Sequence, residues 1–139
     1  MMSYTSSTIH PADNDLRDLY HPLFSEHEVD LVLQAHNLNY QRTYPLIYNG
    51  QNPSEPIISD KNQQTYYDPE GEIYLKAGTA GAELHEFEGQ RPFVLRQLAN
   101  HGFVSIDITD NGEKLISTFY QNDLVNKDQF LIIKDLVTE

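Results

Sequence analysis

A histidine in a polar stretch, directly after an apolar run, has the position of a metal ligand. The stretch "QAHNLNYQRTYP" covers residues 34–45 and follows the run "VDLVL" at 29–33. Open α/β folds bind ligands beyond the carboxyl ends of their strands, where His36 is placed, and a neutral imidazole there suits zinc, iron or manganese. A histidine two residues on would complete a pair, but Leu38 has no donor atom. The local spacing therefore leaves two interpretations open, a metal ligand or a histidine hydrogen-bonded to its own loop.

Two more residues could contact a substrate. Arg42 follows the histidine loop and could bind phosphate as a bidentate donor, or it could form a salt bridge with one of the 21 acidic residues. His101 could face a cleft or lie on a surface loop. The remaining histidines are expected to face solvent, and the tyrosines of the central region are expected to pack with their hydroxyls at the rim. These are His10, His21, His27 and His85, and Tyr40, Tyr44, Tyr48, Tyr66, Tyr67 and Tyr74.

Two stretches that resemble ligand loops lack the decisive residue. "DITDNGEKLIST" at 107–118 has no glutamate at its twelfth position, as a calcium loop requires, so a hairpin turn is predicted. "GTAGAEL" at 78–84 is not followed by Gly-Lys-Ser/Thr, so a tight turn is predicted instead of a phosphate loop.

Composition excludes several classes of protein. The chain has 139 residues, 39% of them hydrophobic, which is one domain's worth and predicts a folded protein. Its net charge of −12 opposes binding to nucleic acid backbones and to anionic membranes. There is no cysteine, no apolar run of membrane-spanning length and no signal-peptide pattern at the N-terminus. We expect a soluble protein, cytoplasmic by default.

A helix and a strand must position the histidine loop. Apolar residues spaced i, i+3, i+4, i+7 and i+8 predict a helix over 13–27 with one apolar face. Asp13 or Asn14 can cap this helix, and Pro22 should kink or tighten its last turn. Residues 29–35 predict a short buried strand. The apolar face of the helix consists of Leu16, Leu19, Tyr20, Leu23 and Phe24.

The rest of the chain predicts a mixed α/β (α+β) protein with mainly antiparallel strands. Residues 36–71 form a long loop region that is functional or carries short strands. Residues 92–99 are ambiguous between helix and strand. The turn sequence Asp-Asn-Gly joins two strands of a three-stranded antiparallel meander. The further strands are predicted at 72–78, 102–110, 114–121 and 128–135.

Several stretches together resemble the calcineurin-like metallophosphoesterases, in their purple acid phosphatase branch. "VDLVLQAHNLNYQR" at 29–42 resembles the strand and the final G-H-x-H motif of that family, followed by "xY(E/Q)R". "LRDLYHPLF" at 16–24 resembles its helix, and "GEIYLKAGTAGAEL" at 71–84 its strand and Gly-rich turn. "NHGFVSIDI" at 100–108 and "STFYQNDLVNKDQFLI" at 117–132 resemble its C-terminal strands. The resemblance implies the C-terminal portion of the family's sandwich.

The resemblance also implies phosphate ester hydrolysis by two metal ions, divalent or trivalent iron, zinc or manganese, about 3.5–4 Å apart. His36 then corresponds to a ligand of the second metal, and Leu38 occupies the place of the first metal's closing histidine. Ala35 replaces the family glycine. The family motifs G-D-x-G, G-D-x-x-Y and G-N-H-(E/D) do not occur in the chain. Since catalytic sites use about three protein ligands, we expect no metal bound at full occupancy and no activity of the chain alone.

Two functional interpretations follow for residues 1–139, taken as a single partial domain. The chain is either the C-terminal segment of a phosphate ester hydrolase, or a non-catalytic interaction module that keeps the fold. In both, a sheet edge lacks cover, so self-association or a partner chain is expected. Exported relatives are common in the family, which leaves the compartment open.

Overall fold

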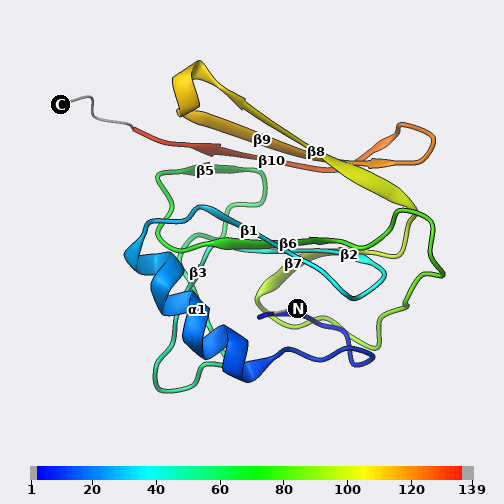
Figure 1. The fold of residues 1–139 in the computed structure, drawn as a ribbon. Coiled ribbons are helices and arrows are strands. Elements are labelled where there is room, and N and C mark those ends of the chain that lie inside the picture. The colour runs from blue at the N-terminus through cyan, green and yellow to red at the C-terminus, as the bar shows by residue number, and fades with distance from the viewer. Residues whose placement is uncertain (1–2, 136–139) are drawn as a thin grey trace.

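The computed structural model describes residues 3–135, which form two packed β-sheets and one helix. Figure 1 shows the second sheet on one face of the first sheet, and helix α1 (Asn14–Glu26) on the opposite face. The mixed α/β class predicted from the sequence is confirmed, with antiparallel pairing dominant. The helix begins where predicted, because the side chain of Asp13 accepts a hydrogen bond from the backbone N–H of Leu16 at 2.9 Å.

The first sheet carries the histidine loop. Its strand order is β1-β6-β2-β7, and β1 runs parallel to β6 while the other neighbours are antiparallel. The segment that was ambiguous between helix and strand is the strand β7. The bounds are β1 (Leu31–Gln34), β2 (Tyr40–Thr43), β6 (Ile73–Ala77) and β7 (Val94–Leu98).

The second sheet contains the predicted meander. Its order is β5-β10-β9-β8, with β5 parallel to β10 and the rest antiparallel. The predicted hairpin turn lies between β8 and β9, where Asn111 and Gly112 take positive φ angles of 56° and 93°. The bounds are β5 (Thr65–Tyr67), β8 (Gly102–Thr109), the 3₁₀ turn η1 (Asp110–Gly112), β9 (Lys114–Gln121) and β10 (Asn126–Ile133).

The long region at 36–71 holds short strands as well as loops. In addition to β2 and β5 it contains a two-stranded antiparallel ladder of β3 (Leu46–Ile47) and β4 (Ile57–Ile58).

The main core lies between the two sheets. The rings of Tyr40 on β2 and Phe119 on β9 stack with their centroids 4.3 Å apart. Tyr40, Tyr66 and Tyr74 are fully buried, so the prediction that their hydroxyls lie at the rim is wrong. The buried residues of this core are Tyr40, Tyr66, Ile73, Leu75, Phe119, Phe130 and Ile132.

The helix α1 packs with a side adjacent to the one that its sequence predicts. Its buried residues are Arg17 and His21, whereas Leu19 is 60% exposed and Leu23 is also exposed. On the buried side, His21 and Glu72 form a close pair in which His21 Nε2 lies 2.7 Å from Glu72 Oε2. This pair anchors the polar side of the helix to the sheet, and it also overturns the expectation that His21 faces solvent. On the apolar side of α1, Leu19, Tyr20 and Leu23 are exposed, whereas Leu16 and Phe24 are half-buried.

The strand β1 was predicted to be buried but lies at the edge of its sheet. Within the described part of the chain it pairs only with β6, and Leu33 is 65% exposed. An apolar run of this kind is typical of a strand with neighbours on both sides.

In residues 3–135 no helix is long and apolar enough to cross a membrane.

Candidate functional site

The loop after β1 places His36 in an unusual backbone conformation. Its φ angle is 114°, a region that residues with a side chain rarely adopt, and the residue is exposed. Such strain persists only where the surroundings fix the backbone. Here the two neighbouring asparagines, Asn37 and Asn39, are fully buried and hold the loop in place.

Asn37 and Asn39 connect the histidine loop to two distant segments. Asn37 Nδ2 donates to the backbone oxygen of His10 at 2.8 Å, and Asn37 Oδ1 accepts from the hydroxyl of Ser7 at 3.0 Å. Asn39 Nδ2 donates to the backbone oxygen of His85 at 3.1 Å. Because these bonds are buried, they draw His10 and His85 to the same end of the first sheet as His36.

A glycine allows β6 and its turn to approach this loop. A Cβ atom on Gly78 would lie 2.1 Å from the backbone oxygen of Asn37, which no side chain can accommodate. The glycine at the end of β6 is therefore needed for this close backbone contact.

Three histidines form a cluster at this end of the sheet. The rings of His10 and His36 stack with centroids 4.2 Å apart, and those of His10 and His85 are 5.5 Å apart. His85 Nδ1 accepts from the backbone N–H of Leu38 at 3.2 Å. Desolvation, and then the positive charges that His36, His85 and Lys76 can carry, lower the pKa of His10. We refer to His10, His36 and His85 as the histidine cluster.

The sequence analysis missed this cluster and placed His10 and His85 in solvent. Both are in fact partly buried. No local pattern could have brought together residues from three separate segments. The only usable signal was the pair of asparagines beside His36, which are strong hydrogen-bonding residues in a loop.

The histidine cluster does not fit a two-metal centre. No group of three His, Asp or Glu side chains in residues 3–135 is arranged to hold one metal ion. The rings of His10 and His36 are stacked face to face, so their nitrogens do not converge on a common point. At position 38 the aliphatic side chain supplies no donor. A catalytic ion needs about three protein ligands, which this arrangement does not provide.

A buried lysine lies beside the cluster. Lys76 on β6 is fully buried, and its Nζ donates to the hydroxyl of Thr5 at 3.2 Å. Burial lowers its pKa to about 7. The sequence analysis did not single out this residue, because a lysine inside a strand is ordinarily solvent-exposed.

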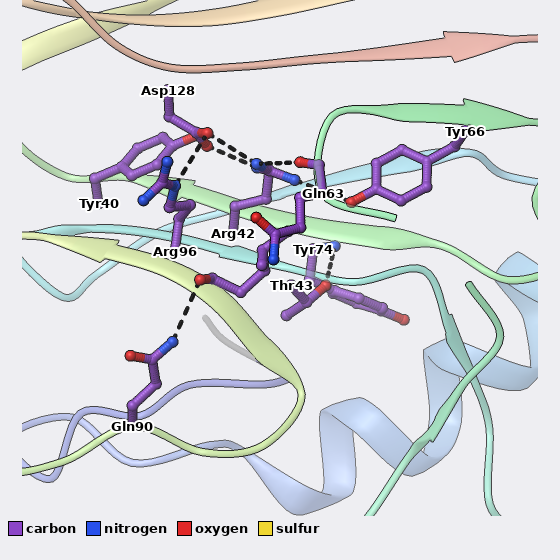
Figure 2. A network of polar contacts seen from close by, with 10 residues as sticks. Tyr40, Arg42, Thr43, Gln63, Tyr66, Tyr74, Gln90, Arg96 and Asp128 are labelled. Carbon is purple, nitrogen blue, oxygen red and sulfur yellow. Dashed lines mark hydrogen bonds and ion pairs between the residues drawn. The ribbon is translucent and has the colours of Figure 1, made fainter. Parts of the chain in front are cut away.

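Arg42 lies between the two sheets and not at the histidine cluster. It is 1% exposed, and its Nε and Nη2 donate to the two carboxylate oxygens of Asp128 on β10 at 2.6 and 2.8 Å. Figure 2 shows this pair together with Tyr40 and Tyr66, whose hydroxyls contact Asp128 and Arg42 respectively. Burial alone would lower the pKa of Arg42. The hydrogen bonds and the negative charge of Asp128 outweigh this effect, so the pKa of Arg42 lies above its ordinary value. The salt bridge is the alternative that the sequence left open, and a phosphate could reach Arg42 only by displacing Asp128.

His101 lies just before β8, on the other side of the Gly-rich turn. Its ring is exposed, and Nδ1 lies 3.3 Å from the backbone oxygen of Thr79. Thr79 follows Gly78, so His101 is linked to the loop of His36 only through this turn.

Comparison with known proteins finds relatives that match most of the chain. The chain is 27% identical over 121 residues to "Probable inactive purple acid phosphatase 1" of Arabidopsis thaliana, and 32% identical over 89 residues to human "Acid phosphatase type 7". These alignments cover 86% and 62% of the chain, but 19% of each relative. No family model matches. A solved purple acid phosphatase from yellow lupin seeds matches 96% of the chain with a TM-score of 0.81 and 25% identity.

The chain matches the C-terminal part of a purple acid phosphatase. It spans about a fifth of the length of the curated relatives and 23% of the lupin chain. The purple acid phosphatase resemblance drawn from "VDLVLQAHNLNYQR" is thus confirmed, and the two sheets with α1 are a segment of the phosphoesterase fold.

Proposed function

We propose that this chain is a C-terminal phosphoesterase segment that does not hydrolyse phosphate esters by itself. The observation that carries the proposal is the loop of His36. This loop offers one imidazole where a two-metal centre requires a pair, because Leu38 supplies no donor. A single imidazole cannot hold a catalytic ion.

Two further observations support this proposal. Arg42, the sequence candidate for a phosphate contact, donates from Nε and Nη2 to the carboxylate of Asp128 and from Nη1 to the hydroxyl of Tyr66. In the histidine cluster, His10 and His36 stack on each other, and His85 uses one ring nitrogen for the loop backbone. The groups that could serve phosphoryl transfer are therefore engaged in the fold. One relative is itself named a probable inactive enzyme.

Metal analysis and a phosphatase assay test this proposal. We expect the purified chain to contain far less than one transition metal ion per molecule after incubation with iron, zinc and manganese. We expect no turnover of p-nitrophenyl phosphate. Paired metals at full occupancy, or a turnover that is lost in His36→Ala, would overturn the proposal. Leu38→His should not restore activity, because it adds one donor where several are needed.

A second candidate function is a non-catalytic interaction module, and the exposed apolar side of α1 favours it. Leu19, Tyr20 and Leu23 are exposed on this helix, and the stacked rings of Tyr20 and Phe24 extend the surface. The occupant proposed for it is a polypeptide that carries the remaining elements of a phosphoesterase domain. The support is that nearly all of this chain superposes on a lupin protein of which it covers 23%.

Co-expression tests this second function. The chain would be produced together with the lupin phosphatase from which the matching segment has been removed. We expect a one-to-one complex that elutes as a single species, and we expect Leu19→Lys to weaken it at least tenfold. Recovery of the chain without the shortened lupin protein would contradict the module interpretation while leaving the proposal on catalysis unaffected.

A further inference from the structure

We propose that two copies of this chain associate through β8, whose free edge pairs with the same edge of a second copy in antiparallel orientation. This inference goes beyond the proposed function, because it uses neither the histidine cluster nor the apolar side of α1. It rests on the hydrogen-bonding pattern and the residue order of one strand.

The strand β8 is the outermost strand of the second sheet. Its residues from Gly102 to Thr109 pair with β9 in continuous register, without a bulge. On its other side no strand pairs with it in the described part of the chain. A long, regular edge strand is a template for another strand, and proteins usually block such edges with lysine, proline or a bulge. The residues of β8 include no lysine and no proline.

The direction of the free backbone groups follows from the bonds at the start of β8. The N–H of Asn122 donates to the oxygen of His101, whereas the N–H of Gly102 donates away from β9, to Thr79. Backbone groups alternate between the two sides along a strand. The N–H and C=O groups of Val104, Ile106 and Ile108 therefore point to the free edge. The side chain of Ile108 is 67% exposed.

The other strand edges are shorter or partly covered. β5 has three residues and β1 has four. On β7 the side chain of Gln90 donates to the backbone oxygens of Val94 and Leu95. At the end of β1 the side chain of Gln34 bonds the backbone of Ser3 and Tyr4. The edge of β8 is the longest of the four, with eight residues, of which Gly102 bonds Thr79 on that side.

The sequence of β8 is complementary to itself in one register. With Ile106 opposite Ile106 of the second copy, each Val104 faces an Ile108 on the inner side of the sheet. On the outer side each Ser105 faces an Asp107 of the second copy, so the two carboxylates do not face each other. The Ser105 hydroxyl donates to Asp107 of its own strand at 3.3 Å, and it would have to exchange this acceptor to bond the second copy. Such pairing around a two-fold axis is the isologous interface of a closed dimer. It would also cover part of the exposed Ile108 side chain.

The charge of the chain sets a condition on this dimer. Each copy carries a net charge of −12, so the two copies repel each other in dilute buffer. Salt screens this repulsion, with a Debye length of about 10 Å at 0.1 M and about 3 Å at 1 M. The dimer should therefore become stronger as salt is added, unlike an association that depends on ion pairs.

Sedimentation equilibrium tests the proposal with three matched lysine substitutions at similarly exposed apolar residues. We expect the wild-type chain to approach twice the monomer mass as protein and salt concentrations rise. Ile108→Lys should remain monomeric, whereas Leu33→Lys on β1 and Leu19→Lys on α1 should dimerise like the wild type. A monomeric wild type, or loss of the dimer in either control variant, would overturn the assignment to β8.

Hydrogen exchange on the unmodified chain gives an independent test that does not depend on a variant folding. The amide of Ile106 faces the free edge, whereas that of Ser105 faces β9. We expect exchange at Ile106 to slow at least tenfold between dilute and concentrated protein, while exchange at Ser105 changes little. Equal rates at Ile106 under both conditions contradict the pairing.

Discussion

Arg42 on β2 and Asp128 on β10 join the two sheets through a buried two-pronged ion pair. Their contacts of 2.6 and 2.8 Å lie inside the sandwich, where Tyr40 adds a third hydrogen bond to Asp128 at 2.7 Å. The guanidinium also lies over the ring of Phe130, 4.8 Å from its centroid. A charged pair at this position specifies how the two sheets face each other. Its removal tests whether it also stabilises the fold.

Removing one partner of this pair should destabilise the protein strongly. Asp128→Asn leaves a buried guanidinium without its counter-charge, and we expect a loss of about 3–5 kcal/mol in the free energy of unfolding. Urea denaturation followed by circular dichroism measures it. The double variant Arg42→Met/Asp128→Leu should lose much less than the sum of the single losses, since it leaves no unpaired charge.

Arg96 provides the control for this ion pair. Its side chain is half exposed, and its Nε lies 3.6 Å from the same carboxylate. Arg96→Ala should cost less than about 1 kcal/mol, as exposed ion pairs do. A loss of similar size in Arg96→Ala and Asp128→Asn would mean that burial does not decide the energy of this pair.

The pair of His21 and Glu72 should likewise anchor α1 to the sheet. His21 Nε2 lies 2.7 Å from Glu72 Oε2 and 3.2 Å from the backbone oxygen of Leu46, and Nδ1 lies 2.7 Å from the hydroxyl of Tyr4. Glu72→Leu removes the carboxylate but leaves the backbone oxygen of Leu46 near Nε2, so we expect a loss of about 1–3 kcal/mol in the free energy of unfolding. Tyr4→Phe removes only one hydrogen bond and should cost about 1 kcal/mol.

Hydrogen exchange shows where the loss in Glu72→Leu occurs. If the pair anchors the helix, amides of α1 should exchange faster while those of β9 stay protected. Loss of protection in both elements together would instead indicate that the pair supports the whole sandwich.

The sequence predicted the strands better than it predicted which faces are covered. The alternation along β8 and the Asn-Gly turn are local patterns, so the meander could be found from them alone. The apolar side of α1 and the apolar run of β1 predicted burial, but Leu19 and Leu33 are exposed in the structure. Periodicity shows which residues are apolar, and it does not show whether another element covers them.

The candidate site could be predicted only in part for a similar reason. His36 was recognisable because its strand and loop are continuous in sequence. His10 and His85 approach it through the buried amides of Asn37 and Asn39, a long-range arrangement without a local signal. Arg42 was noted as a candidate, but its partner is 86 residues away along the chain.

Lys76 should make stability depend on pH in the alkaline range. Burial lowers its pKa in the folded protein from 10.5 to about 7. Between these values the unfolded chain binds more protons than the folded chain, so the free energy of unfolding rises with pH. The rise should be at most about 1.4 kcal/mol per pH unit between about pH 7 and 9.5, before exposed tyrosines ionise in the unfolded chain.

Urea denaturation of wild type and Lys76→Met at several pH values measures this effect. The variant should lack the rise, so the wild type should gain stability relative to it as the pH increases. Lys127→Met, at an exposed position, is the control and should follow the wild type. Parallel curves for wild type and Lys76→Met would contradict the prediction, because they would mean that Lys76 has the same pKa in the folded and the unfolded chain.

Gly78→Ala should disturb the histidine cluster through the backbone of its loop. The new Cβ would lie 2.1 Å from the backbone oxygen of Asn37, so β6 and the loop must move apart. We expect a loss of at least about 1–3 kcal/mol in the free energy of unfolding, the usual cost of overpacking. Gly50→Ala is the matched control, because its Cβ would meet no atom within 4 Å.

Nuclear magnetic resonance of the imidazole protons reports the cluster directly. The signals of His10, His36 and His85 should shift in Gly78→Ala and stay in place in Gly50→Ala. If the cluster signals are unchanged in Gly78→Ala, the close approach of β6 does not position these histidines.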